Sequence, residues 1–397
     1  MGAAFVPKDR PMLSREERNP LSDWWWTVDR PLLAAILALM LSGVVLSLAA
    51  SPPVAVRIGL DPFHFFSHHV MFLLPSIVVM IGVSFMSPRQ VRRSAMIVFA
   101  ISVVLIVATL GLGPEVKGSR RWITLLGLNI QASESAKPAF VVLAAWAFSE
   151  GGRRPEMPAT MLAFAMLFTC IPLLILQPDF GQTMLLSITW GALFFLAGLR
   201  WMWTAGFLGA AFAGVFGAYK FIPHVTSRLQ RFLDPASGDT FQIDTSLESF
   251  MRGGWFGRGP GEGTVKRILP DSHTDFIYAV AAEEFGIILC LIILALFSFI
   301  VIRSLRHAMR EQDAFTRLAI SGLALLFGLQ SAIAMAVSLY LMPSKGMTLP
   351  FVSYGGSSLI SLALGMGMLI ALTRRRPQAR VDAEQPASNF YAESPAR

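Results

Sequence analysis

Ten apolar stretches, each long enough to cross a lipid bilayer as a helix, constrain the fold of this chain more than any other feature of its sequence. Of the 397 residues, 54% are hydrophobic and 15% are charged, whereas a soluble domain carries about 25% charged residues. A helix of about 20 residues spans the hydrocarbon core. The sequence therefore predicts an all-α, polytopic membrane protein. The ten stretches lie near 31–50, 64–86, 94–112, 135–149, 159–177, 182–199, 204–222, 275–302, 317–341 and 354–373.

The distribution of charge predicts which ends of the spans face the cytoplasm. With the N-terminus inside, the inner segments hold 20 Lys and Arg against 12 Asp and Glu, and all other segments hold 13 of each. The net charge of +8 then falls on one side, as the positive-inside rule requires. We predict a cytoplasmic tail over 1–30, a ten-span domain over 31–373, and a cytoplasmic, disordered tail over 374–397. The basic charge thus indicates topology and contact with anionic membrane lipids, not nucleic-acid binding.

Cysteine and histidine spacing gives little sign of a metal site. Cys170 and Cys290 lie in separate predicted spans, which indicates packing residues rather than a disulfide or a metal centre. His64 and His68 lie four residues apart, a spacing that can bind zinc on a helix, but the sequence offers no acidic or cysteine partner nearby.

Long polar segments collect on the predicted outer face. Segment 113–134 is too polar to span, and segment 223–275 forms the longest loop, an extracytoplasmic one. Loops longer than about 12–15 residues are usually functional or disordered. The dense order of glycine, aromatic and charged residues in this loop favours function. The predicted inner loops are short and basic, with no room for an active site.

Asp275 stands where the large outer loop meets the eighth apolar stretch. A carboxylate at a membrane surface is costly to desolvate and therefore points to a function. The nearby cations Arg258 and Lys266 can hold a phosphate, so the loop suggests chemistry on a lipid-borne phosphate. Two alternatives follow for Asp275. Either it or Thr274 caps the next helix, or Asp275 is a general base that faces the outer leaflet.

Other acidic residues allow both a structural and a functional interpretation. Glu134 and Lys137 share a helix face and can pair, either structurally or, with Arg121, as a polar pocket. Asp179, in QPDFGQ, is either the N-cap of the next span or a second carboxylate of the outer site.

Two further features lie in or next to the last three spans. Glu283 and Glu284 fall inside the eighth stretch and must face a cavity or a cation, either as a structural salt bridge or as part of a transport path. Segment 343–358 interrupts the chain before the last span, and Ser357 with its neighbouring glycines leaves N–H groups that an anion could bind.

Four strings resemble the SEDS family (shape, elongation, division and sporulation) of bacterial membrane proteins, and the resemblance covers nearly all of residues 30–375. The third string is similar to the cell-division branch rather than the elongation branch. The strings are RRWITLLGLNIQASESAK (120–137), QPDFGQT (177–183), GRGPGEGTVKRILPDSHTDFIYAVAAEEFG (257–286) and MPSKGMTLPFVSYGGSS (342–358).

This resemblance implies a glycosyltransferase that polymerises lipid II into peptidoglycan strands at the outer face of the bacterial cytoplasmic membrane, at the division site. The essential aspartate of the family falls on Asp275, which we predict to be catalytic. A divalent cation, Mg²⁺ or Mn²⁺, is predicted at Asp275 or Asp179. The predicted substrate-binding residues are Glu134, Lys137, Arg121, Asp179, Arg258, Lys266, His273 and Ser357.

The resemblance also implies partners and leaves alternatives. Members of the family work beside a class B penicillin-binding protein and other division proteins. A lipid II flippase is one alternative function, for which the intramembrane Glu283 and Glu284 would serve as a path. A scaffold that recruits division proteins through its tails is another.

Overall fold

A computed structural model describes most of the membrane domain. The predicted tails beyond residues 19 and 375 lie outside the described residues, and so does most of 222–240 in the large outer loop. The described residues are 19–115, 118–125, 127–153, 158–198, 201–221, 226, 230, 241–343 and 346–375.

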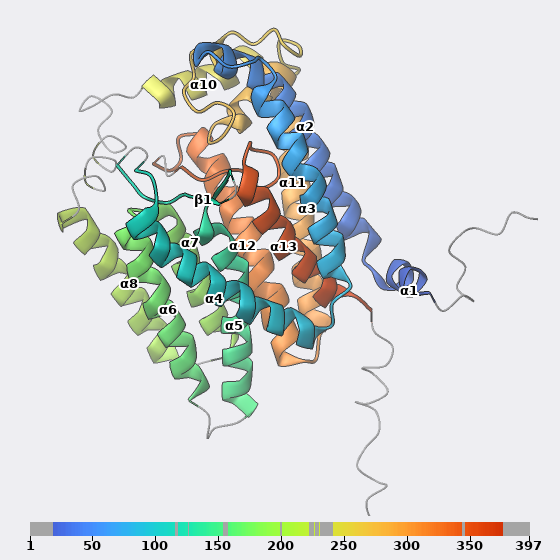
Figure 1. Ribbon diagram of the computed structural model, residues 1–397, viewed down its shortest axis with the longest axis vertical. Coiled ribbons are helices and arrows are strands. Elements are labelled where there is room, and N and C mark those ends of the chain that lie inside the picture. Colours follow the sequence, from blue (N-terminus) through green and yellow to red (C-terminus); the bar gives the residue numbers. More distant parts are fainter. Residues whose placement is uncertain are drawn as a thin grey trace, which may run out of the picture.

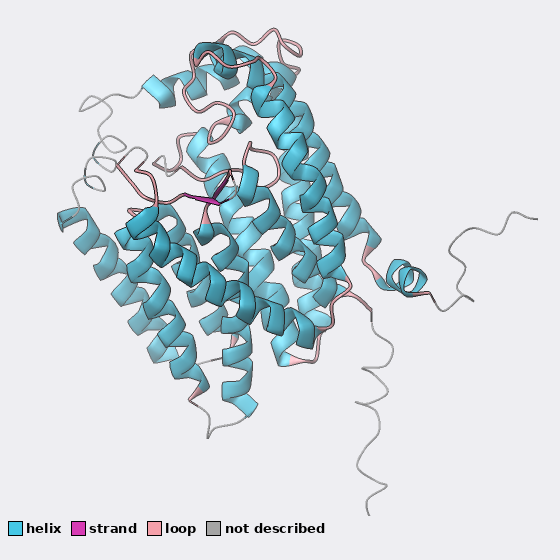
Figure 2. Ribbon diagram, in the orientation of Figure 1, coloured by secondary structure: helices cyan, strands magenta, loops and turns pink. Residues whose placement is uncertain are grey.

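Helices account for nearly all of the described chain, and a single hairpin of two short strands accompanies them (Figures 1 and 2). The antiparallel strands pair Ile123 with Ile130. The elements are α1 (Pro20–Thr27), α2 (Arg30–Arg57), α3 (His64–Ser84), α4 (Pro88–Leu112), β1 (Ile123–Leu125), β2 (Leu128–Ile130), α5 (Ala132–Arg153), α6 (Ala159–Leu176), α7 (Phe180–Leu196), α8 (Trp201–Phe221), α10 (Phe241–Gly253), α11 (Ile277–Arg310), α12 (Ala314–Ser338) and α13 (Gly356–Thr373).

A helix coincides with each of the ten predicted stretches, so the predicted all-α polytopic class is confirmed. Within the described ranges, seven helices are long and apolar enough to cross a membrane: α2, α3, α4, α6, α11, α12 and α13. Helix α7 is apolar but shorter. The count of ten spans therefore stays a prediction. Four elements were not predicted, namely α1 within the predicted N-terminal tail, the hairpin before α5, and α10 and the short 3-10 helix Val265–Arg267 inside the large outer loop.

The first span is longer than predicted because α2 continues through two prolines. It ends at Arg57 and contains Pro52 and Pro53, whereas the apolar stretch ends near residue 50. The hydroxyl of Ser51 donates to the carbonyl of Pro62 at 3.0 Å and accepts from the N–H of Phe66 at 3.2 Å. Pro53 cannot donate to the carbonyl of Ala49, and the Lys266 ammonium donates to that carbonyl instead, at 3.0 Å. Such replacement partners let a spanning helix tolerate proline.

Helices α5, α12 and α13 form the centre of the bundle. In an apolar 18-residue part of each helix, 72% of α12 and 78% of α13 are buried inside the protein, against 22% of α4. Helix α13 packs closely along α3, because a Cβ atom at Gly367 would lie only 2.7 Å from the carbonyl oxygen of Met80. These central helices carry four polar residues described below, namely Glu134, Lys137, Gln330 and Ser357.

Different elements lie at the two ends of the bundle. At one end, α10 packs against the first turns of α11 (Figure 1). At the other end, the indole N–H of Trp24 in α1 donates to Ser84 at the end of α3, at 2.8 Å. The backbone N–H of Arg375 donates to the carbonyl of Thr27 at 3.1 Å. Both ends of the described chain therefore meet at the same end of the bundle.

Helix α11 is broken at Gly286, and segment 253–259 fills the break. Gly286 has φ of 80° and ψ of 179°. In an unbroken helix, the N–H groups of residues 287 and 288 would donate to the carbonyls of Glu283 and Glu284. They donate instead to the carbonyls of residues 254 and 255, at 2.9 and 3.3 Å. The carbonyls of Glu283 and Glu284 accept instead from the N–H groups of Arg258 and Gly259, at 2.9 and 3.0 Å.

Replacing Gly286 with alanine should destabilise this end of the protein. A side chain disfavours the φ of 80°, and its Cβ would overlap the backbone of Trp255 and Gly257. We expect Gly286→Ala to cost at least about 1–3 kcal/mol and to lower the midpoint of thermal unfolding of the detergent-solubilised protein. Gly209→Ala is the control, because a Cβ atom there meets nothing within 4 Å. Equal midpoints for both variants would contradict this reading of the break.

Candidate functional site

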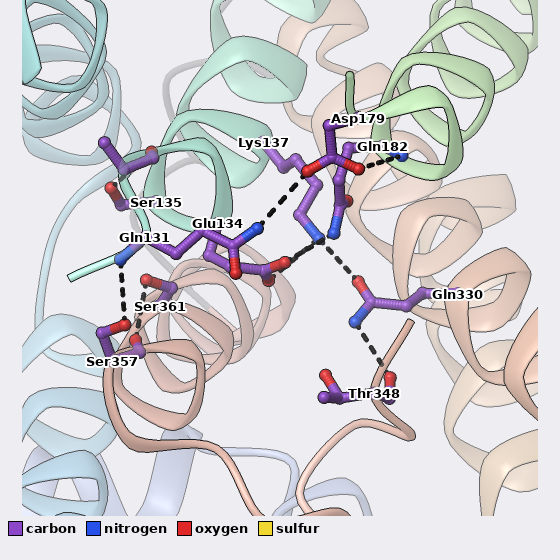
Figure 3. Close-up of polar contacts among 11 residues, drawn as sticks. Gln131, Glu134, Ser135, Lys137, Asp179, Gln182, Gln330, Thr348, Ser357 and Ser361 are labelled. Carbon is purple, nitrogen blue, oxygen red and sulfur yellow. Dashed lines mark hydrogen bonds and ion pairs between the residues drawn. The ribbon is translucent and has the colours of Figure 1, made fainter. Parts of the chain in front are cut away.

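A buried ion pair between Glu134 and Lys137 lies at the centre of the bundle. Their side chains are 4% and 3% exposed, and Lys137 Nζ lies 2.9 Å from Glu134 Oε2. Glu134 Oε1 accepts from the Gln182 amide of α7 at 2.6 Å, and Lys137 Nζ donates to the Gln330 carbonyl of α12 at 3.0 Å (Figure 3). A buried pair is tolerated when such extra hydrogen bonds satisfy it. The pair thus ties α5 to α7 and α12.

Asp179 caps α7 and is fully engaged by its neighbours. Its Oδ1 accepts from the backbone N–H of Gln182 at 3.4 Å and lies 3.7 Å from Arg121 Nη1, while its Oδ2 accepts from the Gln131 amide at 3.4 Å. Burial raises the pKa of Asp179, and the Arg121 guanidinium opposes that rise. The predicted N-cap role is confirmed. The carboxylate and Arg121 also hold the hairpin segment against the start of α7.

Ser357, in the first turn of α13, joins this network through Gln131. The backbone N–H of Gln131 donates to Ser357 Oγ at 3.2 Å, and its side chain reaches Asp179 on the other side (Figure 3). The structure therefore brings Glu134, Lys137, Asp179 and Ser357 together around the start of α5. Sequence reasoning missed Gln131, Gln182 and Gln330. Their signal was available, because Gln182 and Gln330 are amides inside apolar stretches.

Asp275 lies in a turn just before α11 and is half-buried. Its backbone N–H, like that of Thr274, donates to the carbonyl of Asp271 at 3.1 Å. Helix α11 begins at Ile277 with Phe276 at the N-cap, and no side chain caps it. The predicted capping role of Thr274 or Asp275 is therefore wrong. The turn at Asp271 thus fixes the backbone of Asp275 just before the helix begins.

The loop before α13 braces this turn. Ser353 Oγ accepts from the N–H of Leu349 at 2.8 Å and donates to the carbonyl of Thr274 at 2.6 Å. The N–H of Tyr354 donates to the carbonyl of His273 at 2.9 Å. These bonds fix the backbone of the two residues just before Asp275.

Gly346 brings the same loop close to the Asp275 carboxylate. A Cβ atom at Gly346 would lie 3.7 Å from Asp275 Oδ2, and Gly346 has a positive φ of 64°. The His273 ring packs at a tilt against the rings of Phe65 and Tyr354, with centroids 4.3 and 5.6 Å away. His273 therefore links the start of α3 to the loop before α13.

The buried ion pair and the Asp275 turn are connected through that loop. The Gln330 amide, which accepts from Lys137, donates to the carbonyl of Thr348 at 3.3 Å (Figure 3). Thr348 precedes Leu349, which is bonded to Ser353 and so to the Asp275 turn. The Glu134–Lys137 pair and the Asp275 turn, which are far apart in the sequence, thus belong to one hydrogen-bonded unit.

Glu283 and Glu284 are held inside the protein by the outer loop. The Glu283 carboxylate accepts from the N–H groups of Thr264, Val265 and Lys266, at 2.6, 2.7 and 2.9 Å. Glu284 forms a salt bridge with the Lys266 ammonium, whose side chain is 3% exposed. Glu284 thus forms a structural salt bridge, with Lys266 of the outer loop rather than with another span. For Glu283, sequence reasoning missed that backbone N–H groups act as its partner.

The remaining predicted cations differ in accessibility. Lys266 also donates to the carbonyl of Ala49 at 3.0 Å, so its ammonium is directed into the protein. Arg258 is exposed, with its Nε donating to the carbonyl of Arg252 at 3.4 Å. Arg121 keeps 21% of its side chain exposed. Of these three, Arg258 and Arg121 are open to a ligand and Lys266 is not.

The described residues do not form a ready site for a divalent cation. No group of three or more His, Cys, Asp or Glu side chains that could hold a metal occurs among them. Both carboxylate oxygens of Asp179 already accept hydrogen bonds. The rings of His64 and His68 lie 4.3 Å apart, but the described part of the chain gives them no third ligand for zinc.

Comparison of sequences gives close relatives. Residues 30–378 match the family described as cell cycle protein, FtsW/RodA/SpoVE. A protein of Caulobacter vibrioides (strain NA1000 / CB15N), described as a probable peptidoglycan glycosyltransferase FtsW, is 45% identical over 367 residues, which are 92% of this chain and 94% of that protein. A protein of the same description from Alkalilimnicola ehrlichii is 35% identical over 379 residues, 91% and 92% of the two chains.

Comparison of structures gives the same fold. A chain from a peptidoglycan synthase complex, described as coordinating polymerization and crosslinking, superposes with a TM-score of 0.74 at 26% identity and covers 88% of this chain and 98% of its own. The rod shape determining protein RodA of Thermus thermophilus has a TM-score of 0.65 at 26% identity, covering 88% and 97% of the two chains.

Removing the cation of the buried pair should destabilise the bundle. Lys137→Met leaves the Glu134 charge buried without its partner, which costs about 3–5 kcal/mol. We expect a lower midpoint of thermal unfolding in detergent, and a partial recovery in the double variant Glu134→Gln with Lys137→Met. Lys220→Met, at an exposed lysine of α8, is the control. A wild-type midpoint for Lys137→Met would show that the pair does not hold these helices.

Proposed function

We propose, because the chain belongs to the FtsW/RodA/SpoVE family of cell cycle proteins, that it is a peptidoglycan glycosyltransferase of septal cell-wall synthesis. Its substrate would be lipid II, polymerised into β-1,4 glycan strands at the outer face of the bacterial cytoplasmic membrane. The 45% identical relative and the synthase-complex chain support the activity. The placement of Asp275, half-buried in a turn that the loop before α13 braces, is the observation that carries the proposal.

The reaction is a displacement at an anomeric carbon. The 4-hydroxyl of the GlcNAc of one lipid II attacks C1 of the MurNAc of a growing strand. The C1–O bond to undecaprenyl pyrophosphate breaks, and its electron pair leaves with the pyrophosphate. Attack from the opposite face inverts C1 and forms the β-1,4 bond. The hydroxyl proton passes to the Asp275 carboxylate, which acts as the general base.

Two accessible arginines would stabilise the departing pyrophosphate. Exposed Arg258 and partly exposed Arg121 can donate to its oxygens, and arginine suits this role because its fork matches phosphate geometry. Lys137 is buried, so in the observed conformation it acts as a positioning residue through Gln330 and the loop at Thr348. Lys266 has no place in this scheme.

A divalent cation stays a prediction, and no step of the proposed reaction goes through it. The described residues alone supply no preformed set of ligands. A cation would therefore have to bind together with the pyrophosphate and Asp275. A chelator added to the polymerisation assay tests this point.

The proposed orientation places both termini in the cytoplasm. It rests on the distribution of Lys and Arg, and the meeting of Thr27 with Arg375 at one end of the bundle supports it. Asp275 then lies at the outer end, beside α10. The proposed location is the division site, and a class B penicillin-binding protein and other division proteins are the proposed partners, inferred from the synthase-complex relative.

No observation favours the flippase alternative. The acidic residues that would form its path are occupied, Glu283 by backbone N–H groups and Glu284 by Lys266. The scaffold alternative depends on tails that lie mostly outside the described residues, and it is compatible with catalysis.

Neutralising Asp275 should abolish polymerisation. Asp275→Asn keeps the size of the side chain but removes the base, and we expect at least the 10²–10⁴-fold loss that is typical of general-base removal. The measurement is gel analysis of glycan strands made from lipid II by purified protein together with its penicillin-binding partner. Glu262→Gln, at an exposed carboxylate of the same loop, should retain activity. Wild-type product from Asp275→Asn would refute the assignment.

Removing the Ser353 hydroxyl should impair catalysis by loosening the Asp275 turn. Ser353→Ala loses the bonds to Leu349 and Thr274, for about 1–3 kcal/mol. We expect a lower kcat for lipid II with little change in KM, since Ser353 positions the base without touching substrate. Ser94→Ala, whose hydroxyl bonds only within its own helix, is the control. An unchanged kcat would mean that this hydroxyl does not position Asp275.

A further inference from the structure

A polar cavity lies at the end of the bundle opposite α10. Its volume is about 240 Å³, well above the roughly 10–15 Å³ that one water molecule needs. Residues from the end of α1, the start of α2, the last turns of α11 and the end of α13 meet there. The lining residues are Trp26, Thr27, Val28, Asp29, Arg30, Pro31, Arg303, His307, Thr373 and Arg375.

The lining carries an excess of positive charge. Three arginines, Arg30, Arg303 and Arg375, face one carboxylate, Asp29. Asp29 Oδ1 accepts from Arg303 Nε at 2.7 Å, and Oδ2 lies 2.5 Å from His307 Nε2. Burial opposes ionisation of Asp29, but the hydrogen bonds from His307 and Arg303 outweigh it and hold the pKa of Asp29 well below its usual range. Asp29 and Arg303 therefore neutralise each other, and two arginines remain.

Those two arginines are exposed and placed at the rim. The Arg30 guanidinium lies over the rings of Trp25 and Trp26, 4.9 and 4.7 Å from their centroids, and its Nε donates to the carbonyl of Trp25. Neither Arg30 nor Arg375 forms an ion pair with a carboxylate in the part of the chain that the structure describes. Trp25 and Trp26 are 36% and 44% exposed, as expected of tryptophans at a membrane–water interface.

We propose that this cavity binds the phosphate group of an anionic phospholipid of the inner leaflet. The inference rests on the proposed orientation, which puts this end at the cytoplasmic surface, but not on the proposed chemistry. Basic pockets between spanning helices on that side suit anionic headgroups. The Arg30 and Arg375 guanidinium groups would donate to the phosphate, and the lipid chains would lie beside α2. A bound lipid would then join α1 to the ends of α11 and α13.

Soluble phosphate offers the same chemistry, so the experiment compares both sources. The full-length protein in detergent is titrated with phosphatidylglycerol, with phosphatidylcholine, or with inorganic phosphate in molar excess, and bound lipid is counted by native mass spectrometry. We expect phosphatidylglycerol to bind more tightly than phosphatidylcholine. We also expect inorganic phosphate to leave it in place. Each of Arg30→Gln and Arg375→Gln should weaken binding about fivefold, and the double variant about thirtyfold.

Arg306→Gln is the matched control, because Arg306 is an exposed arginine of α11 that does not line the cavity. It should bind phosphatidylglycerol as the unmodified protein does. Equal loss in this control, unchanged binding in the double variant, or equal affinity for phosphatidylcholine would overturn the proposal. Displacement by inorganic phosphate would overturn the lipid assignment. Asp275→Asn should bind the lipid normally, so failure of the proposed glycosyl transfer and failure of this site are distinguishable.

Discussion

The need to satisfy every backbone N–H and carbonyl determines how the end of this protein that carries α10 and Asp275 is built. Helix α11 breaks at Gly286, and the hydrogen bonds lost there are replaced one for one by segment 253–259. Irregular backbone is tolerated at such a place only when the protein itself covers it. Segment 253–259 binds the backbone of Glu283, and the Glu283 carboxylate binds the N–H of Lys266, from which the chain continues to the Asp275 turn. The break in α11 and the segment that covers it therefore set the position of the candidate base.

The charged pairs inside the bundle have a different role from the Asp275 carboxylate at the end that carries α10. Glu134 with Lys137 and Glu284 with Lys266 are buried and paired. Such pairs contribute register between helices rather than much net stability. Asp275 lies instead in a turn whose backbone is held by hydrogen bonds from the loop before α13, and it stays half-buried. A half-buried carboxylate in a fixed turn is suited to accept a proton.

Much of this arrangement could be predicted from the sequence, and the failures have physical causes. The lengths of the apolar stretches and the low share of charged residues can be read directly from the sequence, so the all-α class could be predicted. The pairing of Glu134 with Lys137 followed from helical spacing. The role of Gly286 could not be predicted, since a single glycine in an apolar run does not reveal a break covered from another segment. The pairing of the Lys266 ammonium with Glu284 could not be predicted, because sequence alone does not show which way a loop cation points. The cap at α11 was misjudged because the turn at Asp271 delays the start of the helix to Ile277 and leaves Phe276 at the N-cap position.

The central claim is that the Asp275 carboxylate faces the outside of the cell, and labelling of single cysteines tests it directly. Asp275→Cys and the exposed Glu262→Cys are made in a chain whose buried Cys170 and Cys290 are replaced by serine. Intact cells or spheroplasts are treated with a membrane-impermeant maleimide, with Arg306→Cys as the inner control. The account predicts labelling at 262 and 275 before permeabilisation and at 306 only afterwards. Labelling of 262 and 275 only after permeabilisation would contradict it.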